Sequence, residues 1–546
     1  MSRHILVAVA WPYASGPRHL GHLAGAYLPA DIFARYHRIA GNDVLMVSGS
    51  DVHGTPITVK AEQEGVEPQV IVDRYHSEFL DAWEQLDISW DLYTSTGTEN
   101  HHAVTQDMFL RLLENGLLEK RVSLQFYDTE AERFLPDRYV EGTCPHCGYK
   151  DARGDQCENC GRTLDPTDLI DPRSSLTGST PVQRETEHFF LLLSRLRDPL
   201  REWLESRTGW RRHVKNWALG MLDDDVPDRA ITRDIEWGVE IPVDDLGPGK
   251  RIYVWFDAVI GYLSASKEWA ATGDDTEAWK LWWEDPKAES YYFVGKDNIP
   301  FHAVIWPGML MGYEGLNLPT DVPANQFVTF GSTKASASKG IGRSIGWYAD
   351  RLQADALRYA IGSVLPEQND TDLSDELIVS RINEELVATW GNLVNRVLSM
   401  SSRNFDGLVP EPGTLSNSDQ ALLDQTDEAL AAVSAHIEKV ELRGGLRTAM
   451  DAATEVNAYL NAEEPWQVIK TDRDRAATVL WTAIQSISGI RVALTPYLPN
   501  STEDIGEMLG LDPLVTSWSR PVVPGGQALG EVKPLFVKLE NDALDD

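Results

Sequence analysis

The strongest constraint on the fold is the alternation of strand and helix patterns in the first hundred residues. An apolar run at residues 5–10 is typical of a buried strand, and a helical pattern then extends to about Ala40. A second apolar run at residues 44–47 leads into Ser48-Gly49-Ser50-Asp51, and another helical pattern covers residues 57–64. Strands and helices that alternate in this way form parallel sheets, which bind ligands beyond the carboxyl ends of their strands. The sequence therefore predicts an α/β domain with its site at that edge.

The length and the later patterns predict further domains. A chain of 546 residues is too long for one core, so roughly two to four domains are expected. The alternation stops near Glu119, resumes near Ile231, and gives way beyond about Asp350 to helical patterns alone. We expect a Rossmann domain split by an insertion, then a helical bundle and an irregular strap. Their predicted ranges are 1–118 and 229–349 for the Rossmann domain, 119–228 for the insertion, 350–520 for the bundle and 521–546 for the strap.

All four cysteines of the chain lie in the insertion, as Cys144-Pro-His-Cys147 and Cys157-Glu-Asn-Cys160. Each pair presents two thiolates to one point, and two pairs close a tetrahedron around Zn²⁺. Two disulfides are the alternative, which a cytosolic chain with no other cysteine disfavours. We therefore predict one structural Zn²⁺, held by four thiolates, that orders the insertion and takes no part in catalysis.

Two segments have the character of phosphate-binding elements. His19-Leu20-Gly21-His22 follows the first strand and opens the first helix, where free N–H groups and the helix dipole attract anions. Two imidazoles on that turn would stabilise a phosphate whose charge grows in a transition state, and Gly21 leaves room for a flat ring. The second segment, residues 334–340, combines lysines, hydroxyls and small residues after another predicted strand. Taken alone, such a segment is most often a flexible surface loop.

Several further motifs stand in order along the chain with the four cysteines: AWPYA at 10–14, HLGH at 19–22, GSDVHGTP at 49–56, FLPDR at 134–138, EHFF at 187–190, YVWFDAVIGY at 253–262 and GKD at 295–297. Taken together and in this order, they resemble the methionyl-tRNA synthetases, a family of class I aminoacyl-tRNA synthetases. The isoleucine, valine and leucine enzymes share the histidine and lysine signatures but carry much larger editing insertions, for which this chain has no room.

The resemblance implies an ATP-dependent ligase. Methionine would be activated to methionyl adenylate and transferred to tRNA(Met), with Mg²⁺ accompanying ATP. The partners would be methionine, ATP and tRNA(Met), with no DNA and no membrane, since no window reaches the roughly 18 apolar residues of a membrane span. The N-terminal apolar run is short and has no cleavage site, so we expect a cytoplasmic protein. We expect no further domain after the strap. The resemblance implies that an added C-terminal domain brings dimerisation in this family, so we expect a monomer.

The resemblance also implies the site residues. His19, His22 and Lys334 would be catalytic. ATP would contact His19, Gly21, His22, Arg233, Gly295, Lys296, Asp297, Lys334, Ser336, Ala337, Ser338 and Lys339. Methionine would lie among Trp11, Tyr13, Asp51, Trp255, Ala258, Tyr262 and His302, with Asp51 at the ammonium group. Arg403 and Trp466 would read the anticodon, because unpaired bases stack on aromatic rings. Without the resemblance, Trp255, Tyr262 and Trp466 are equally well explained as core aromatics.

Four positions depart from the family's usual pattern. Trp11 stands where many members have leucine, Val259 where proline is common, Ala337 where the second lysine of the loop is usual, and Ser399 where some members have asparagine. Two alternatives therefore stay open. One is a catalytically weakened paralogue that binds RNA or an amino acid, and the other is a synthetase for a methionine analogue.

The charge of the chain bears on its use of RNA. The formal net charge of −35 argues against indiscriminate nucleic-acid binding, because phosphate contact needs local positive charge. A basic cluster in the insertion is therefore either a docking face for RNA or a solvated helix face. Its members are Arg195, Arg197, Arg201, Arg207, Arg211, Arg212 and Lys215.

Overall fold

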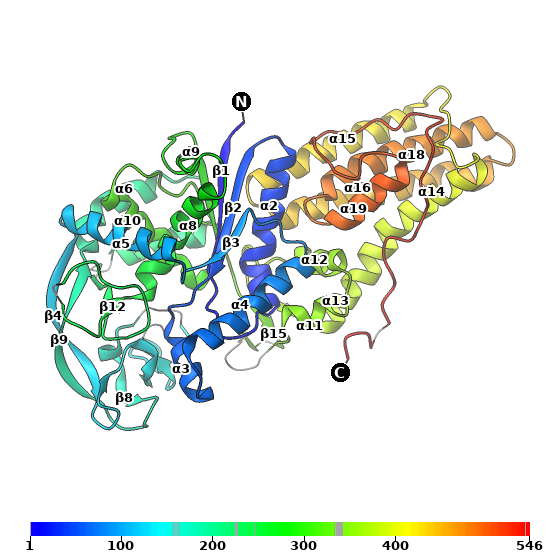
Figure 1. The fold of residues 1–546 in the computed structure, drawn as a ribbon. Helices are drawn as coiled ribbons and strands as arrows, with labels where there is room; N and C mark the ends of the chain where they lie inside the picture. Colours follow the sequence, from blue (N-terminus) through cyan, green and yellow to red (C-terminus); the bar gives the residue numbers. More distant parts are fainter. Residues whose placement is uncertain are drawn as a thin grey trace.

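The N-terminal half is built on a sheet of five parallel strands (Figure 1). The computed structural model describes residues 2–545 apart from 155, 156, 158, 161, 163, 224, 225, 227, 245, 332, 335–341 and 541. The strand order is β14 (Ala324–Asn325), β13 (Glu289–Gly295), β1 (His4–Val9), β2 (Asp43–Ser50) and β3 (Leu92–Ser95). Ile5 to Val9 are fully buried, because parallel strands are covered by helices on both faces. The predicted α/β domain is thus confirmed.

Successive residues of β1 face opposite sides of the sheet. Ile5, Val7 and Val9 join the core that contains α2 (Leu28–Ile39) and α4 (Pro68–Gln85). Leu6 and Ala8 join a second core on the other face. That second core is built from α5 (Glu99–Glu114), α8 (Val254–Ala271) and α10 (Trp306–Tyr313), and Figure 1 shows α8 and α2 on opposite sides of the strands. The first core continues into the C-terminal bundle, so the two halves share apolar packing.

The insertion is a long antiparallel ribbon that carries a small module with the four cysteines. β4 (Leu118–Asp128) and β9 (Val182–Leu191) pair from Leu118 with Leu191 to Tyr127 with Val182. At the far end of this ribbon, β6 (Val140–Thr143), β7 (Ala152–Arg153) and β8 (Ile170–Ser174) form a three-stranded sheet. A separate small core that includes Cys144 and Cys157 underlies it.

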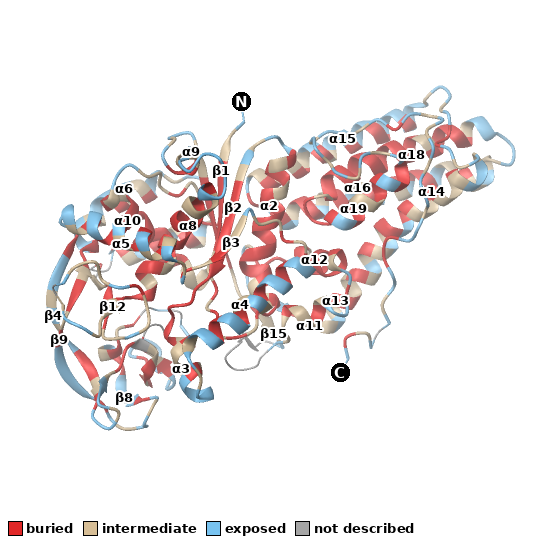
Figure 2. Cartoon of the chain, in the orientation of Figure 1, coloured by how far each residue is buried: buried red, intermediate tan, exposed pale blue. Residues whose placement is uncertain are grey.

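The C-terminal half is helical. One continuous helix consists of α13 (Asp375–Ser380), the π-helical η8 (Arg381–Gly391) and α14 (Asn392–Asn404). It packs against α16 (Leu442–Glu463) and α18 (Arg473–Leu494), which also pack against α15 (Asn417–Glu438). The shorter helices α17 (Pro465–Val468) and α19 (Pro499–Leu509) complete the bundle. By length and apolar composition α18 alone among the described helices passes a test for membrane spans, but 94% of its apolar window is buried inside the protein. Figure 2 shows α18 as a core helix.

The residues after α19 cross the bundle as an irregular strap (Figure 1). Gln527 accepts a hydrogen bond from the Val409 amide at 2.8 Å, and Leu539 donates one to Asn383 at 2.8 Å. Val523, Leu535 and Phe536 bury their side chains against the helices. The strap is therefore held by both backbone pairing and apolar contact.

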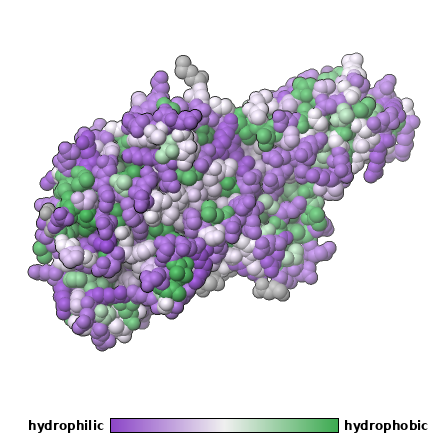
Figure 3. All heavy atoms as spheres, in the orientation of Figure 1, coloured by the Kyte–Doolittle hydropathy of each residue, from purple (hydrophilic) through white to green (hydrophobic). Residues whose placement is uncertain are grey.

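Most side chains of the basic cluster in the insertion form contacts with other groups of this chain. Arg195, Arg197 and Lys215 donate hydrogen bonds to backbone carbonyls, and Arg201 pairs with Asp223. Partly buried Arg211 donates to the carbonyls of Ala324 and Val440, which ties the sheet to the bundle. These contacts favour a structural role over RNA docking for most of the cluster. The face drawn in Figure 3 is mostly hydrophilic, with scattered apolar patches.

Candidate active site and metal centre

The predicted site residues gather at the carboxyl edge of the sheet. Trp11 and Tyr13 follow β1, Asp51 follows β2, and Lys296 follows β13. The chain after β1 pairs with the chain after β2, because the Ala14 amide donates to the Asp51 carbonyl and the Asp51 amide donates to the Pro12 carbonyl, both at 2.9 Å. Residues from three neighbouring strands thereby meet beyond the sheet, where parallel α/β folds bind ligands.

His19 caps the N-terminus of the first helix. Its Nδ1 accepts a hydrogen bond from the Gly21 amide at 3.1 Å, so the neutral ring carries its proton on Nε2. The His22 ring lies 3.9 Å from that of His19, between centroids, and its Nδ1 accepts from the His19 amide at 3.2 Å. Buried Arg18, which the motif did not single out, places its guanidinium 3.3 Å from Nε2 of His22. Two imidazoles and a cation thus lie together at a helix N-terminus.

The helix behind these histidines has a π-helical turn, η1 (Leu23–Tyr27), between α1 (Leu20–His22) and α2. A π turn leaves carbonyl groups without their usual partners. Buried Asn325 at the end of β14 donates to the carbonyls of Ala24 and Gly25 at 3.0 and 3.1 Å. This contact fixes the first helix against the sheet edge.

The described residues on either side of positions 335–341 pair with neighbouring elements. The backbone of Lys334, in β16 (Thr333–Lys334), pairs with Thr329. After the segment, Ser344 forms a β-bridge with His19, and the Ile345 amide donates to the Arg18 carbonyl at 2.7 Å. The predicted ATP contacts Ser336, Ala337, Ser338 and Lys339 lie outside the described residues. The residues from Ser344 onward are therefore fixed beside His19 and Arg18, at the candidate phosphate site.

Helix α8 provides one wall of the candidate methionine pocket, with Trp255, Ala258 and Tyr262 spaced three and four residues apart. The Tyr262 hydroxyl lies 2.6 Å from Nε2 of His302, whose Nδ1 lies 2.9 Å from the Asn298 carbonyl. A carbonyl only accepts, so Nδ1 carries the proton and Tyr262 donates to Nε2. Burial raises the pKa of Tyr262 and lowers the pKa of His302 to about 4, so both groups are neutral.

Two glycines make room for the Trp11 indole. A Cβ atom on Gly261 of α8 would lie 2.6 Å from Cε2 of Trp11, and one on Gly49 of β2 would lie 2.2 Å from Cζ3 of the same ring. The ring therefore lies between the helix and the end of the strand, with its centroid 6.4 Å from that of Tyr262. Gly54 has the same relation to Tyr13, whose ring would be 2.3 Å from a Cβ at that position.

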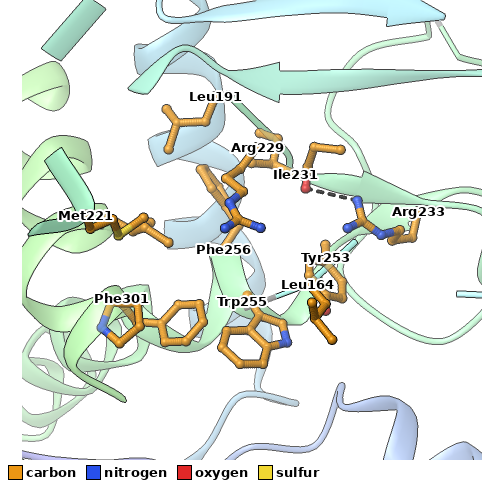
Figure 4. A pocket seen from close by; sticks show the side chains of 13 residues that line it. Leu164, Leu191, Met221, Arg229, Ile231, Arg233, Tyr253, Trp255, Phe256 and Phe301 are labelled. Carbon is orange, nitrogen blue, oxygen red and sulfur yellow. Dashed lines mark hydrogen bonds between the residues drawn. The ribbon is translucent and has the colours of Figure 1, made fainter. Parts of the chain in front are cut away.

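An apolar cavity of about 60 Å³ adjoins this pocket (Figure 4). Trp255 and Phe301 form one wall, with their ring centroids 3.7 Å apart. Arg233, expected at ATP, lies in the opposite part of the lining, and its guanidinium is 4.2 Å from the centre of the Tyr253 ring. Lys296, also expected at ATP, forms an ion pair with Asp370 at 2.7 Å. Gly295 and Asp297 flank it at the end of β13 and in the following turn.

Asp51 is buried beside two residues that the motif-based analysis did not single out. The His53 amide donates to Oδ1 of Asp51 at 3.2 Å, and Nδ1 of His53 lies 2.6 Å from Oδ2 of Asp257. Burial, and then the neighbouring Asp257 carboxyl, raise the pKa of Asp51 well above its usual range. His53 and Asp257 both fall inside the segments that carry the family likeness, and this position was the available signal for them in the sequence.

The four cysteines converge as predicted. Their sulfur atoms all lie within 4.8 Å of one another, and the Cys144–Cys160 and Cys147–Cys157 separations are 4.0 and 3.5 Å. Disulfide sulfurs lie about 2.05 Å apart, whereas sulfurs at the corners of a tetrahedron around Zn²⁺ lie about 3.8 Å apart. Gly148 has a φ of +73°, which the first turn requires and glycine adopts freely. The cluster is thus arranged to hold a metal ion.

The two predicted anticodon residues lie in the bundle, far along the chain from the sheet edge. Arg403 is exposed near the end of α14, and Trp466 is half-buried in α17. Arg396, which the sequence analysis did not single out, places its guanidinium 5.7 Å from the centre of the Trp466 ring and donates to Asn457 at 2.8 Å. Ser399 donates to Asn395 of the same helix.

Comparison with known proteins identifies the family. The model for tRNA synthetases class I (M) matches residues 5–398, and the model for the anticodon binding domain of methionyl tRNA ligase matches residues 409–546. The methionine–tRNA ligase of Thermomicrobium roseum is 50% identical over 578 residues, which cover 100% of this chain and 98% of that protein. That of Dehalococcoides mccartyi is 49% identical over 548 residues, covering 100% and 99%.

A solved structure, Mycobacterium tuberculosis methionyl-tRNA synthetase in complex with methionyl-adenylate, aligns with a TM-score of 0.81 at 27% identity and covers 98% of this chain and 100% of its own. Sequence and structure therefore agree over the whole length. The chain belongs to the methionyl-tRNA synthetase family of class I aminoacyl-tRNA synthetases.

Proposed function

We propose that this protein activates methionine with ATP and transfers it to tRNA(Met), as a methionine–tRNA ligase. The observation that carries the proposal is the meeting of two elements at one sheet edge. One is a helix N-terminus that bears His19 and His22, and the other is a pocket that bears Asp51, Tyr262 and His302. The first suits phosphate groups and the second suits an amino acid with an apolar side chain. Residues 1–118 and 229–349 would supply this chemistry.

In the activation step, the methionine carboxylate attacks the α-phosphorus of ATP. A bond forms between the carboxylate oxygen and phosphorus, the bond to the bridging oxygen breaks, and pyrophosphate leaves as the Mg²⁺ complex in which ATP arrives. No side chain needs to become a covalent intermediate, so catalysis consists of positioning and of stabilising phosphate charge. His19 would donate from Nε2, and Arg18, whose guanidinium lies 3.3 Å from Nε2 of His22, would supply positive charge beside the two rings. Lys334 and Lys339 would stabilise the negative charge that builds on the pyrophosphate as it leaves.

Methionine would be held by its two ends. The Asp51 carboxylate would accept a hydrogen bond from the ammonium group. The aromatic rings of Trp11, Trp255 and Tyr262 would surround the thioether, since sulfur packs well against ring edges. Neutral His302 and the Tyr262 hydroxyl, already paired with each other, leave no unpaired charge beside that side chain. Such a pocket excludes charged side chains because they would lose their hydration.

In the transfer step, a hydroxyl of the terminal ribose of the tRNA attacks the methionyl carbonyl. The new ester bond forms, the bond to phosphate breaks, and AMP leaves with the electron pair. Residues 350–520 would recognise the anticodon, with Trp466 stacking on a base and Arg403 and Arg396 supplying positive charge. We also propose a cytoplasmic monomer whose four-cysteine site holds Zn²⁺, because its sulfur separations fit that ion.

Methionine-dependent exchange of labelled pyrophosphate into ATP tests this proposal. A synthetase gives exchange with methionine and none with leucine or valine. A synthetase for a methionine analogue would give faster exchange with that analogue, and a paralogue without activity would give none with any amino acid. Because Ala337 stands at a usual lysine, the same assay on Ala337→Lys measures what that position contributes. An increase of ten-fold or more would identify a weakened enzyme.

A further inference from the structure

A second buried carboxyl, Asp257, neighbours Asp51, the residue proposed to hold the substrate ammonium group, and no arginine or lysine pairs with either among the described residues. Asp51 and Asp257 are 3% and 0% exposed. The ion-pairing partners of Asp257 in the described structure are His53 and His101, and Oδ1 of Asp257 has no hydrogen-bond partner. Methionine brings one positive charge, which balances one carboxylate. The second carboxylate therefore needs a different explanation.

His53 connects the two carboxyl groups. Its backbone N–H donates to Oδ1 of Asp51 at 3.2 Å, and its Nδ1 lies 2.6 Å from Oδ2 of Asp257. Asp257 is in the first turn of α8, whose register also sets Trp255, Ala258 and Tyr262. The Asp257–His53 contact therefore fixes the end of β2, and with it Asp51, relative to the helix that forms the rest of the pocket.

His101 does not supply the proton of this contact. The Ser264 hydroxyl donates to the Gly261 carbonyl at 3.1 Å, so it accepts from Nδ1 of His101, which lies 2.8 Å away. The proton of neutral His101 is thus on Nδ1, and its Nε2 accepts from the Thr105 hydroxyl at 3.2 Å. That Nε2 is 3.9 Å from Asp257, beyond hydrogen-bond distance. One proton, shared with His53, is what remains for Asp257.

Among the described residues, no arginine or lysine forms an ion pair with Asp257 that would favour a second negative charge. His53 faces the rings of His101, His102 and Trp237, with centroids 6.3, 5.2 and 6.4 Å away. Burial lowers the pKa of all three histidines, that of His53 to about 4, so they are neutral near pH 7. Burial raises the pKa of both the Asp51 and the Asp257 carboxyl, which disfavours two negative charges at this place, and Tyr262 remains a phenol. The 2.6 Å contact with Nδ1 of neutral His53 is what assigns the proton to Asp257 and not to Asp51.

We propose that Asp257 and His53 form an uncharged hydrogen-bonded pair that positions Asp51, so that Asp51 is the single negative charge offered to the substrate ammonium group. The proton lies between Oδ2 of Asp257 and Nδ1 of His53, and the His53 amide then orients Oδ1 of Asp51. Asp257 is a positioning residue and does not touch the substrate. The inference rests on the proposed role of Asp51 as the ammonium partner.

The shape of the pair makes its test specific. Asparagine at 257 has the size of aspartate and donates an N–H to Nδ1 of His53, as a protonated carboxyl would. Alanine removes the contact and leaves His53 without its partner. Loss of one buried hydrogen bond of this kind typically costs roughly 5- to 150-fold in affinity. Asp257→Asn should therefore retain methionine affinity within about three-fold, whereas Asp257→Ala should weaken it by about ten-fold or more.

The experiment measures methionine KM and kcat in pyrophosphate exchange, and inhibition by 4-(methylthio)butanoate, which is methionine without its amino group. The expected result is that Asp257→Ala raises the methionine KM, leaves the ATP KM unchanged, and leaves inhibition by the analogue within about three-fold. Glu268→Ala is the matched control, because Glu268 is a carboxylate of the same helix that accepts a hydrogen bond from Thr94 at 2.8 Å. It should leave methionine KM unchanged.

Three outcomes would overturn the inference. Equal losses in Asp257→Asn and Asp257→Ala would mean that the charge of Asp257 matters and the pair is not neutral. Equal loss of affinity for methionine and for its deaminated analogue would mean general damage to the pocket. Normal methionine KM in a folded Asp257→Ala protein would mean no positioning role. Absence of methionine-dependent exchange in the wild type would instead refute the proposed function, which keeps the two failures apart.

Discussion

Trp11 packs against Gly261. We therefore predict that the effect of Gly261→Ala on stability depends on which residue occupies position 11. In Gly261→Ala the new Cβ would lie 2.6 Å from Cε2 and 2.7 Å from Cζ2 of the indole, whereas carbon atoms in contact lie about 3.5–4.0 Å apart. The ring has no space to retreat toward β2, because the backbone at Gly49 closes its other side. The helix or the ring must therefore shift by about 1 Å.

Two opposing terms set the magnitude. Overpacking of this kind costs about 1–3 kcal/mol, and replacing a helical glycine by alanine gains about 1 kcal/mol. Gly261→Ala should therefore be neutral or destabilising by up to about 2 kcal/mol in the wild type. In a Trp11→Leu background the clash is absent, so the same change should stabilise by about 1 kcal/mol. The two substitutions should be coupled by about 1–3 kcal/mol.

Thermal unfolding of the four proteins measures this coupling, and methionine KM in pyrophosphate exchange reports on the pocket. We expect Gly261→Ala to lower Tm in the wild type and to raise it in Trp11→Leu, with a parallel rise in methionine KM only when tryptophan is present. An equal effect of Gly261→Ala in both backgrounds would refute the packing argument, since the indole would then not be what fills the space.

Three further predictions concern the phosphate site, the metal and the anticodon. His22→Ala should slow adenylate formation by about 10²–10³-fold with little change in ATP KM, and an unchanged rate with a raised ATP KM would indicate uniform binding instead. Protein purified without added zinc should contain one equivalent of the metal, because apparent binding energies are about 10–16 kcal/mol, and Cys147→Ser should lower the content. Trp466→Ala should leave pyrophosphate exchange intact and reduce charging by about 5- to 150-fold, since base stacking contributes about 1–3 kcal/mol. Normal charging would return Trp466 to the core.

Local patterns predicted much of this architecture. The apolar run of β1 and the spacing of the four cysteines are readable in the sequence because each depends on residues close together in the chain. The histidine motif was readable for the same reason, as a helix start after a strand. The family likeness then connected these segments, which no periodicity does, and implied which side chains meet in the pocket.

Contacts between distant segments could not be predicted from the sequence. His53 and Asp257 are separated by 204 positions, and nothing in either segment alone indicates that the ring and the carboxyl share a proton. The π-helical turn after His22 depends on Asn325, which is about 300 positions away. The basic cluster of the insertion shows the converse, because its arginines suggested RNA contact while their partners are mostly carbonyls and carboxylates of this chain.

Charging of tRNA by the purified protein is the most direct measurement of the proposed activity. The protein, ATP with Mg²⁺, labelled methionine and a tRNA(Met) transcript would be incubated, and methionine esterified to the tRNA would be measured against a transcript with a substituted anticodon. We predict ATP-dependent esterification of tRNA(Met), strong reduction with the substituted anticodon, and no esterification when labelled leucine or valine replaces methionine. Labelling of the tRNA without ATP, or normal pyrophosphate exchange without any charged tRNA, would contradict the proposed function.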